Sequence, residues 1–121
     1  MKATFVRLSA RFGEEFGHVQ TRGNEFKIKY DNKDLQQLSG GERSTAQLNL
    51  LLSMMSCVDF PFCIMDEFDI CMDERRRSLS LHQLIHAAES TDGQFIFVTP
   101  HSIEALGSNV LNKDYIGKFT V

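Results

Sequence analysis

Four apolar residues run directly into two acids at residues 62–67, FCIMDE. An apolar run of this length that stops abruptly is typical of a parallel strand buried in a sheet. Ligands of open α/β sheets bind at the carboxyl ends of such strands, so Asp66 and Glu67 stand where chemistry can be carried out. An aspartate there can hold a magnesium ion through water, and the next glutamate can orient and polarise an attacking water. The alternative is an acidic pair that only caps the loop after a core strand.

Helices alternate with strands around this stretch. Leu, Met and Ala dominate residues 42–57, which predicts a helix, and a second helix fits residues 73–90. A second apolar strand spans residues 94–99 and is broken by Pro100. This alternation predicts an α/β fold, with a mainly parallel sheet covered by helices on both faces. A helical turn at residues 102–106 and an edge strand at residues 115–121 complete the expected order.

The beginning of the chain predicts a helix and a hairpin. Apolar side chains recur at helical spacing over residues 1–17, at Phe5, Leu8, Phe12 and Phe16. Residues 18–22 and 25–30 flank Gly23-Asn24, a pair suited to a two-residue turn, so these segments predict a β-hairpin. A polar turn over residues 31–34 is expected to close the hairpin.

A glycine pair stands immediately before the helix predicted over residues 42–57, within residues 38–44, LSGGERS. Gly40 and Gly41 let backbone N–H groups approach a phosphate closely, and the helix N-terminus adds unpaired donors and the positive end of its dipole. The segment therefore suits an anion. The alternative is that Ser39 and Glu42 form a capping box with no ligand at all.

Composition excludes several classes of protein. The chain has 121 residues, a formal net charge of −3 and 42% hydrophobic residues, which suits one small globular domain. No apolar run approaches the roughly 18 residues of a membrane span, and the first residues lack the apolar segment of a signal peptide, so no membrane partner is expected. The acidic balance excludes a uniformly basic nucleic-acid coat, although a local basic face remains compatible with it.

The cysteines and histidines do not predict a zinc site. Cys57, Cys63 and Cys71 lack CxxC spacing, which favours reduced thiols, and the last two are expected to pack as small apolar residues. Residues 82–86, HQLIH, resemble the H-E-x-x-H zinc motif, but Gln83 replaces the glutamate that acts as general base. A carboxamide cannot take a proton from zinc-bound water, so we expect an ordinary helix surface.

Three consecutive arginines, Arg75, Arg76 and Arg77, follow Asp73 and Glu74 at the start of the second helix. Cations near a helix N-terminus are mildly unfavourable, which points to a functional use such as contacts to DNA phosphates. The alternative is a solvated helix face that the two neighbouring acids neutralise.

Taken together, these motifs resemble a known family. LSGGERS followed by FCIMDEFD and then by the strand FIFVTPHS looks like the C-terminal ATPase lobe of SMC (structural maintenance of chromosomes) proteins, whose heads are of the ABC type. The phrases DEFDICMD and FVTPHS look most like the branch that forms subunit six of the SMC five-six complex. The resemblance implies that residues 18–121 form the C-terminal lobe of a P-loop NTPase head, with residues 1–17 ending a returning coiled coil.

The resemblance also implies roles for individual residues. The ABC signature, residues 38–44, would meet the γ-phosphate of ATP held by a partner head, through Ser39, Gly40, Gly41 and Glu42. Asp73 falls in the D-loop, which reaches across the interface between heads. In the Walker B strand, residues 62–67, Asp66 would be the acid associated with magnesium through water and Glu67 the catalytic base. His101, in the switch region of residues 99–102, would sense the γ-phosphate.

A P-loop is missing from this sequence. The motif needs two glycines five positions apart, and none of the eight glycines has such a partner. The resemblance therefore implies an ATPase that needs ATP, Mg²⁺, an N-terminal Walker A lobe and a partner SMC head in a heterodimer. It further implies a kleisin-type subunit, DNA, and a nuclear, chromosomal role in repair and recombination. The isolated chain is expected to be inactive, and the alternative is a non-catalytic head fragment that acts as an interaction module.

Overall fold

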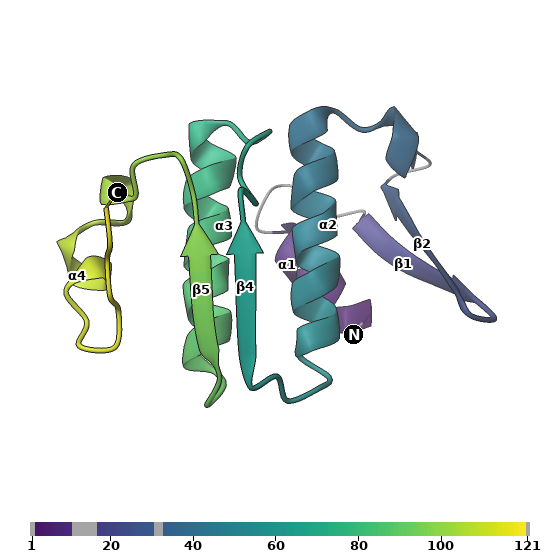
Figure 1. Cartoon of the computed structure of the whole chain (residues 1–121). Helices are drawn as coiled ribbons and strands as arrows, with labels where there is room; N and C mark the ends of the chain where they lie inside the picture. The colour runs from purple at the N-terminus through teal and green to yellow at the C-terminus, as the bar shows by residue number, and fades with distance from the viewer. Residues whose placement is uncertain (1, 11–16, 31–32, 121) are drawn as a thin grey trace.

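The computed structural model describes residues 2–10, 17–30 and 33–120 (Figure 1). The major elements, in chain order, are α1 (Lys2–Ala10), β1 (Gly17–Arg22), β2 (Glu25–Tyr30), β3 (Lys33–Asp34), α2 (Gly40–Met55), β4 (Phe62–Asp66), α3 (Glu74–Glu89), β5 (Gln94–Val98) and α4 (Ser108–Leu111). Short 3-10 turns at Leu35–Gln37 and Glu104–Leu106 complete them. Among the described residues, no helix has the length and apolarity needed to cross a membrane.

The two long helices and the two apolar strands form where the sequence predicts them. β4 and β5 pair in parallel, with Ile64 opposite Ile96, which confirms an α/β fold with a parallel sheet. Alternate side chains of both strands turn inward and pack on a core that α1, α2 and α3 share. The buried members of that core are Leu8, Leu48, Leu52, Met55, Met65, Met72 and Leu84.

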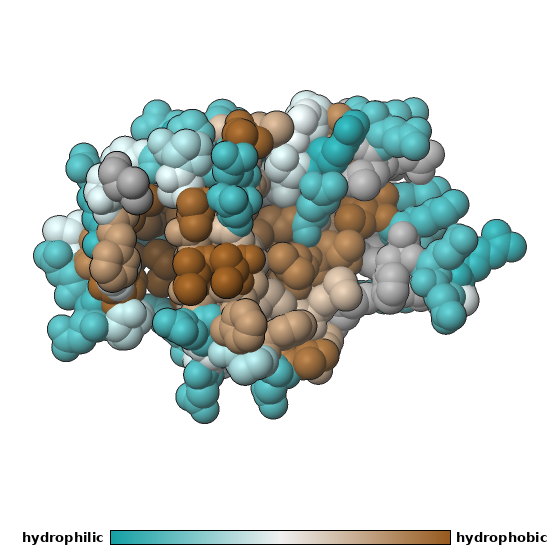
Figure 2. All heavy atoms as spheres, viewed as in Figure 1, coloured by the Kyte–Doolittle hydropathy of each residue, from teal (hydrophilic) through white to brown (hydrophobic). Residues whose placement is uncertain are grey.

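The opposite face of β4 and β5 is bare, so the prediction that helices cover both faces is wrong. Phe62 and Ile64 of β4 are 61% and 59% exposed, and Ile96 and Val98 of β5 are 43% and 47% exposed. Figure 2 shows apolar side chains gathered over these strands on the face turned to the viewer, while Figure 1 shows α3 behind them. The inward positions are occupied by Cys63, Met65, Phe95 and Phe97, so the helices of this chain cover one side of the sheet.

The predicted hairpin is confirmed and gains a third strand. β1 and β2 pair in antiparallel register, and Gly23 takes a φ of 61° in the turn, a backbone conformation that glycine adopts readily. β3 falls within the segment predicted as a polar turn, because its two residues pair with Lys29 and Tyr30 at the end of β2. The sheet packs near α1, where Phe5, Ile28, Leu38 and Ala46 form a second buried cluster.

The helix predicted over residues 1–17 agrees with α1 for residues 2–10, and Phe5 and Leu8 are buried as its spacing requires. Gly17 already belongs to β1, so that helix cannot reach it. Phe12 and Phe16 lie outside the described residues.

The C-terminal segment corrects another expectation. Residues 115–120 form no strand, whereas the 3-10 turn at Glu104–Leu106 confirms the predicted helical turn. A strand needs a partner edge, and this segment instead binds a helix: Lys113 and the Tyr115 hydroxyl both donate to the carboxylate of Glu89 at the end of α3. Side-chain contacts thus fix this part of the chain in place of a backbone ladder.

Candidate functional site

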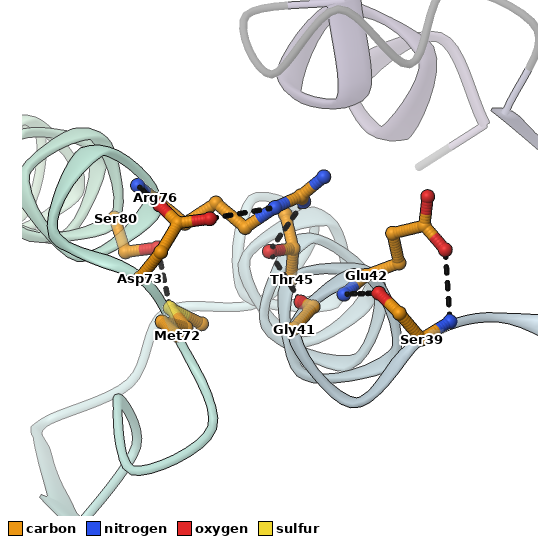
Figure 3. Close-up of polar contacts among 8 residues, drawn as sticks. All are labelled: Ser39, Gly41, Glu42, Thr45, Met72, Asp73, Arg76 and Ser80. Atoms are coloured by element: carbon orange, nitrogen blue, oxygen red, sulfur yellow. Dashed lines mark hydrogen bonds and ion pairs between the residues drawn. The ribbon is translucent and has the colours of Figure 1, made fainter.

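Ser39 caps α2 in the manner of a capping box. Its Oγ accepts a hydrogen bond from the Glu42 backbone N–H at 3.2 Å, and its own N–H donates to Glu42 Oε2 at 2.8 Å (Figure 3). The capping-box interpretation of these two residues is therefore confirmed. It does not compete with an anion, because an accepting hydroxyl still has its own proton to donate, and the N–H groups of Gly40 and Gly41 have no acceptor within the helix.

The two glycines of this turn meet different surroundings. A Cβ placed on Gly41 would lie 3.1 Å from the carbonyl oxygen of Cys71 and 3.5 Å from Cδ of Arg76. A Cβ on Gly40 would meet only Cβ of Cys71, at an ordinary 3.8 Å. The first turn of α2 thus packs tightly against the segment that leads into α3, and a side chain at position 41 would have to displace the Cys71 carbonyl by a few tenths of an ångström. Cys71 is exposed, so the prediction that it packs like Cys63 as a small apolar residue is wrong.

Asp73 begins α3 as its N-cap. Oδ1 accepts a hydrogen bond from the Arg76 backbone N–H at 2.8 Å, and Oδ2 lies 3.8 Å from Nε of the same arginine. The Arg76 guanidinium also donates through Nη1 to Oγ1 of Thr45, at 3.1 Å. Thr45 in turn donates to the carbonyl of Gly41 at 2.9 Å. A chain of contacts therefore joins the predicted D-loop residue to the predicted signature turn (Figure 3).

The acidic pair lies where β4 ends. Asp66 is exposed and continues the bare face, two residues beyond Ile64 on the same strand. Glu67 is also exposed and takes a φ of 50°, a conformation that costs a residue other than glycine about 1–3 kcal/mol. Its N–H donates to the carbonyl of Val98 at 2.9 Å, so the turn after β4 stays attached to β5. Both carboxylates are thereby presented to solvent at the carboxyl end of the sheet.

Asp69 is a site residue that the sequence interpretation missed. Its side chain is completely buried, and Oδ2 accepts a hydrogen bond from the Thr99 hydroxyl at 2.6 Å. Oδ1 is buried without a hydrogen-bond partner among the described residues. An acid placed between two apolar residues, Phe68 and Ile70, was the available sign of burial. The contact ties the loop after β4 to the switch region after β5.

His101 follows this contact. Its backbone N–H donates to Thr99 Oγ1 at 3.1 Å, and this exposed residue lines a cavity of about 270 Å³ together with Glu74 and Arg77 of α3. His101 therefore lies beside the start of α3.

The arginine run does not form one continuous basic face. Arg75 is exposed, Arg76 reaches inward to Thr45, and Arg77 lines the cavity beside His101. Arg76 thus has protein partners in place of open solvent.

The remaining candidates for metal chemistry have structural surroundings. Gln83 is buried and donates to the carbonyl of Leu8, in the last turn of α1, where carbonyl groups have no hydrogen-bond donor within the helix. His82 and His86 are exposed. Burial raises the pKa of the Cys63 thiol, which keeps it protonated in the core. The described residues contain no group of three His, Cys, Asp or Glu side chains able to hold a metal ion. Asp66 nevertheless fits Mg²⁺, which typically takes one or two carboxylates together with phosphate and water.

The predicted signature turn, the D-loop residue, the acidic pair and the switch region lie at one edge of the molecule. Figure 1 shows that α2 and α3 begin, and that β4 and β5 end, at the same edge. The sequence interpretation placed each motif on the correct element, and the fold brings them together.

Comparison with known proteins adds a family. The profile described as the RecF/RecN/SMC N terminal domain matches residues 15–112. The "Structural maintenance of chromosomes protein 6" of Dictyostelium discoideum is 40% identical over 89 residues, which are 73% of this chain and 7% of that protein. The human protein of the same name is 39% identical over 79 residues, or 64% of this chain and 7% of that protein. The chain therefore spans about a fourteenth of the length of these relatives.

Solved structures give the same fold. An SMC head bound to the C-winged helix domain of ScpA superposes with a TM-score of 0.70 at 20% identity, covering 84% of this chain and 35% of that one. The SMC head domain from Thermotoga maritima gives a TM-score of 0.63 at 22% identity, covering 88% of this chain and 40% of that one.

Proposed function

The chain belongs to the RecF/RecN/SMC family, and on that premise we propose that it is the C-terminal lobe of an SMC ATPase head. In this proposal the lobe supplies the ABC signature and the Walker B acids for ATP-dependent engagement of two heads. The observation that carries the proposal is the shared edge at which the first turns of α2 and α3 meet the carboxyl ends of β4 and β5. Four motifs that are spread over about sixty residues act there as one surface.

The signature turn would bind the γ-phosphate of ATP held by the partner head. The Ser39 hydroxyl and the free N–H groups of Gly40 and Gly41 are the donors, at the positive end of the α2 dipole. Glu42 keeps Ser39 in place through the capping box. Asp73 at the start of α3 would face the same interface as the D-loop.

The acids would serve ATP held by the head to which this lobe belongs. Asp66 would hold Mg²⁺ through water, and the ion neutralises phosphate charge when it is bound. Glu67, exposed on its left-handed turn, would orient the attacking water and accept its proton. His101, which lines the cavity beside the start of α3, would sense the γ-phosphate.

The proposal defines the partners that the lobe needs. A P-loop must come from another lobe, because this sequence contains no such motif. The bare apolar face of β4 and β5 suits an N-terminal Walker A lobe that continues the core across the sheet. A second SMC head, a kleisin-type subunit and DNA follow from the family, as does a nuclear, chromosomal location in repair and recombination.

A second candidate function rests on the same bare face. An apolar sheet surface can serve as a docking site whether or not ATP is hydrolysed, so the chain can act as an interaction module without catalysis. The two candidate functions differ in whether Ser39 is needed for the chain to bind its partner.

The test introduces Ser39→Arg into the lobe, co-expressed with its complementary P-loop lobe and with the partner head. We expect ATP binding to the cognate P-loop to persist. ATP-dependent cross-linking between heads should be lost, because the long arginine side chain would occupy the space that the γ-phosphate needs. The matched control is Gln47→Arg, at an exposed position of the same helix outside the signature. Engagement that survives Ser39→Arg unchanged would leave the capping box as the whole role of Ser39 and favour the interaction module.

A further inference from the structure

We propose that Arg76 is a positioning residue that fastens the signature turn of α2 to the D-loop cap of α3. This inference rests on the proposed function, because it assigns Arg76 to the surface that meets the partner head's ATP. The feature that points to it is the Arg76 contact chain: the guanidinium, the carboxylate of Asp73, the hydroxyl of Thr45 and the carbonyl of Gly41.

The contact chain is continuous and leaves its central hydroxyl satisfied. Nη1 of Arg76 donates to Oγ1 of Thr45 at 3.1 Å, and that hydroxyl in turn donates a hydrogen bond to the carbonyl of Gly41 at 2.9 Å. Thr45 is completely buried, so losing either partner would leave a polar group unsatisfied in the interior. Gly41 is thereby held from its carbonyl side, while its N–H side faces the proposed phosphate.

The other end of the guanidinium fixes the start of α3. Nε lies 3.8 Å from Oδ2 of Asp73, whose Oδ1 is occupied by the Arg76 backbone N–H. The Arg76 side chain is 20% exposed and that of Asp73 is 67% exposed, so the arginine points inward while the aspartate stays open to the interface. Figure 3 shows the Arg76 side chain extending from α3 across to Thr45 on α2.

Steric packing reinforces the same junction. The methylene stem of Arg76 lies 3.5 Å from the position of a Cβ on Gly41, and the carbonyl oxygen of Cys71 lies at 3.1 Å. Because Gly41 has no side chain, α3 can approach α2 closely here, and the Arg76 guanidinium can reach Thr45. One guanidinium thus hydrogen-bonds Thr45 and forms an ion pair with Asp73, and the compact ammonium of lysine lacks the planar, delocalised shape that spans the two partners.

In this proposal the first turns of α2 and α3, which both face the partner's nucleotide, move together. A displacement of Asp73 would be transmitted through Arg76 and Thr45 to Gly41, the second glycine of the signature. The geometry assigns Arg76 to this coupling and leaves contact with DNA to the exposed Arg75.

The experiment uses the assembled head pair, with the lobe joined by its complementary P-loop lobe and by the partner head. Arg76→Ala and Thr45→Val are each expected to weaken ATP-dependent head engagement about tenfold, the scale of one lost hydrogen bond to a charged group. ATP binding to the cognate P-loop should not change. Thr45→Ser keeps the hydroxyl and should restore engagement, and Arg76→Lys should restore little of it.

Three comparisons separate the possible outcomes. Arg75→Ala, on the same helical turn but exposed, should leave engagement unchanged. The double variant Arg76→Ala/Thr45→Val should be no weaker than either single variant, since both break one contact chain. Additive losses, or a Thr45→Ser variant that behaves like Thr45→Val, would overturn the assignment.

Ser39→Arg in the same assay keeps the two proposals distinct. If Ser39→Arg blocks engagement while Arg76→Ala engages like the parent, the inference fails and the proposed function stands. If Ser39→Arg has no effect, the proposed function itself fails. Equal losses of DNA binding in Arg75→Ala and Arg76→Ala, with engagement intact, would return Arg76 to a nucleic-acid surface.

Discussion

Asp69 is buried, and among the described residues its carboxylate has one hydrogen-bond partner, the hydroxyl of Thr99. Burying an unpaired carboxylate is costly, so this short 2.6 Å contact has a large influence on the loop between β4 and α3. It also bridges two loops that carry proposed site residues, Glu67 on one side and His101 on the other. Stability and site geometry depend on the same hydroxyl.

Thr99→Val is therefore expected to lower the free energy of unfolding by about 1–3 kcal/mol, because it removes the donor and keeps the shape. Urea denaturation followed by circular dichroism measures the change. Thr99→Ser is the matched control and should lie close to the parent. Equal stability of the Val and Ser variants would contradict the role given to the hydroxyl.

Residues whose roles depend on local spacing were predictable from the sequence. Ser39 and Glu42 stand three positions apart, as a capping box requires, and Asp66 and Glu67 follow an apolar run directly. Asp69 and Arg76 were not predictable in the same way. Their partners, Thr99 and Thr45, lie 30 and 31 residues away, and only the folded chain brings them together.

At the scale of elements, the junction between α2 and the segment before α3 distinguishes two adjacent glycines. Gly40→Ala adds a Cβ at an ordinary 3.8 Å contact and should stabilise α2 by up to about 1 kcal/mol through helix propensity. Gly41→Ala places its Cβ 3.1 Å from the Cys71 carbonyl oxygen, so it should lose that gain and become less stable than the parent. Thermal melting of the two variants is the measurement. Melting temperatures that shift by the same amount and in the same direction would contradict this packing.

The contact between the C-terminal segment and α3 should depend on pH. Hydrogen bonds from Lys113 and then from Tyr115 lower the pKa of the Glu89 carboxyl below its usual 4.5. A carboxyl whose pKa is lower in the folded state stabilises the fold above its unfolded pKa, and that contribution is lost as pH falls through the folded pKa. The pKa of Lys113 is raised above its usual 10.5, chiefly by its hydrogen bond to Glu89, so its contribution is lost as pH rises through the folded value.

We therefore expect the ring signals of Tyr115 in NMR spectra to shift toward those of a free tyrosine as pH falls below about 4.5. Glu89→Gln should give a weaker contact and remove that acid transition. An acid transition that is unchanged in Glu89→Gln would show that another group controls the segment.

Most elements formed by periodic apolar residues were predicted to within a few positions. The helix predicted over residues 1–17 is an exception, since Gly17 already belongs to β1, and β3, α4 and residues 115–120 are others. The two-residue strand β3 forms because the end of β2 provides its hydrogen-bonding partner. The strand predicted at the C-terminal end does not form, and Tyr115 instead binds Glu89 of α3. Neither partner could be identified from the segment's own sequence.

At the scale of the whole molecule, the bare face of β4 and β5 is the largest departure from the prediction. Apolar residues on both sides of a strand indicate burial on both sides, and the absent P-loop lobe is the cover expected for the side that the described helices leave bare. The order of the motifs was nevertheless enough to predict the family, which the match over residues 15–112 confirmed.

Ile64→Thr/Ile96→Thr tests the role of that face. Threonine keeps β-propensity at these exposed positions, so the isolated chain should retain its circular dichroism spectrum and bind less of a hydrophobic dye. The same variant should fail to form a complex with the P-loop lobe. Gln94→Thr, at an exposed position on the same face, is the control. Undiminished pairing by the double variant would place the missing lobe elsewhere.

The most direct test of Glu67 as the catalytic base is ATP turnover by the assembled head pair that carries Glu67→Gln. A general base contributes about 10²–10⁴-fold to the rate, so turnover at the site this lobe completes should fall at least about a hundredfold. ATP binding and ATP-dependent engagement should persist, because the amide keeps the shape of the carboxylate and Ser39 is untouched. Turnover equal to that of the parent would rule out Glu67 as the general base.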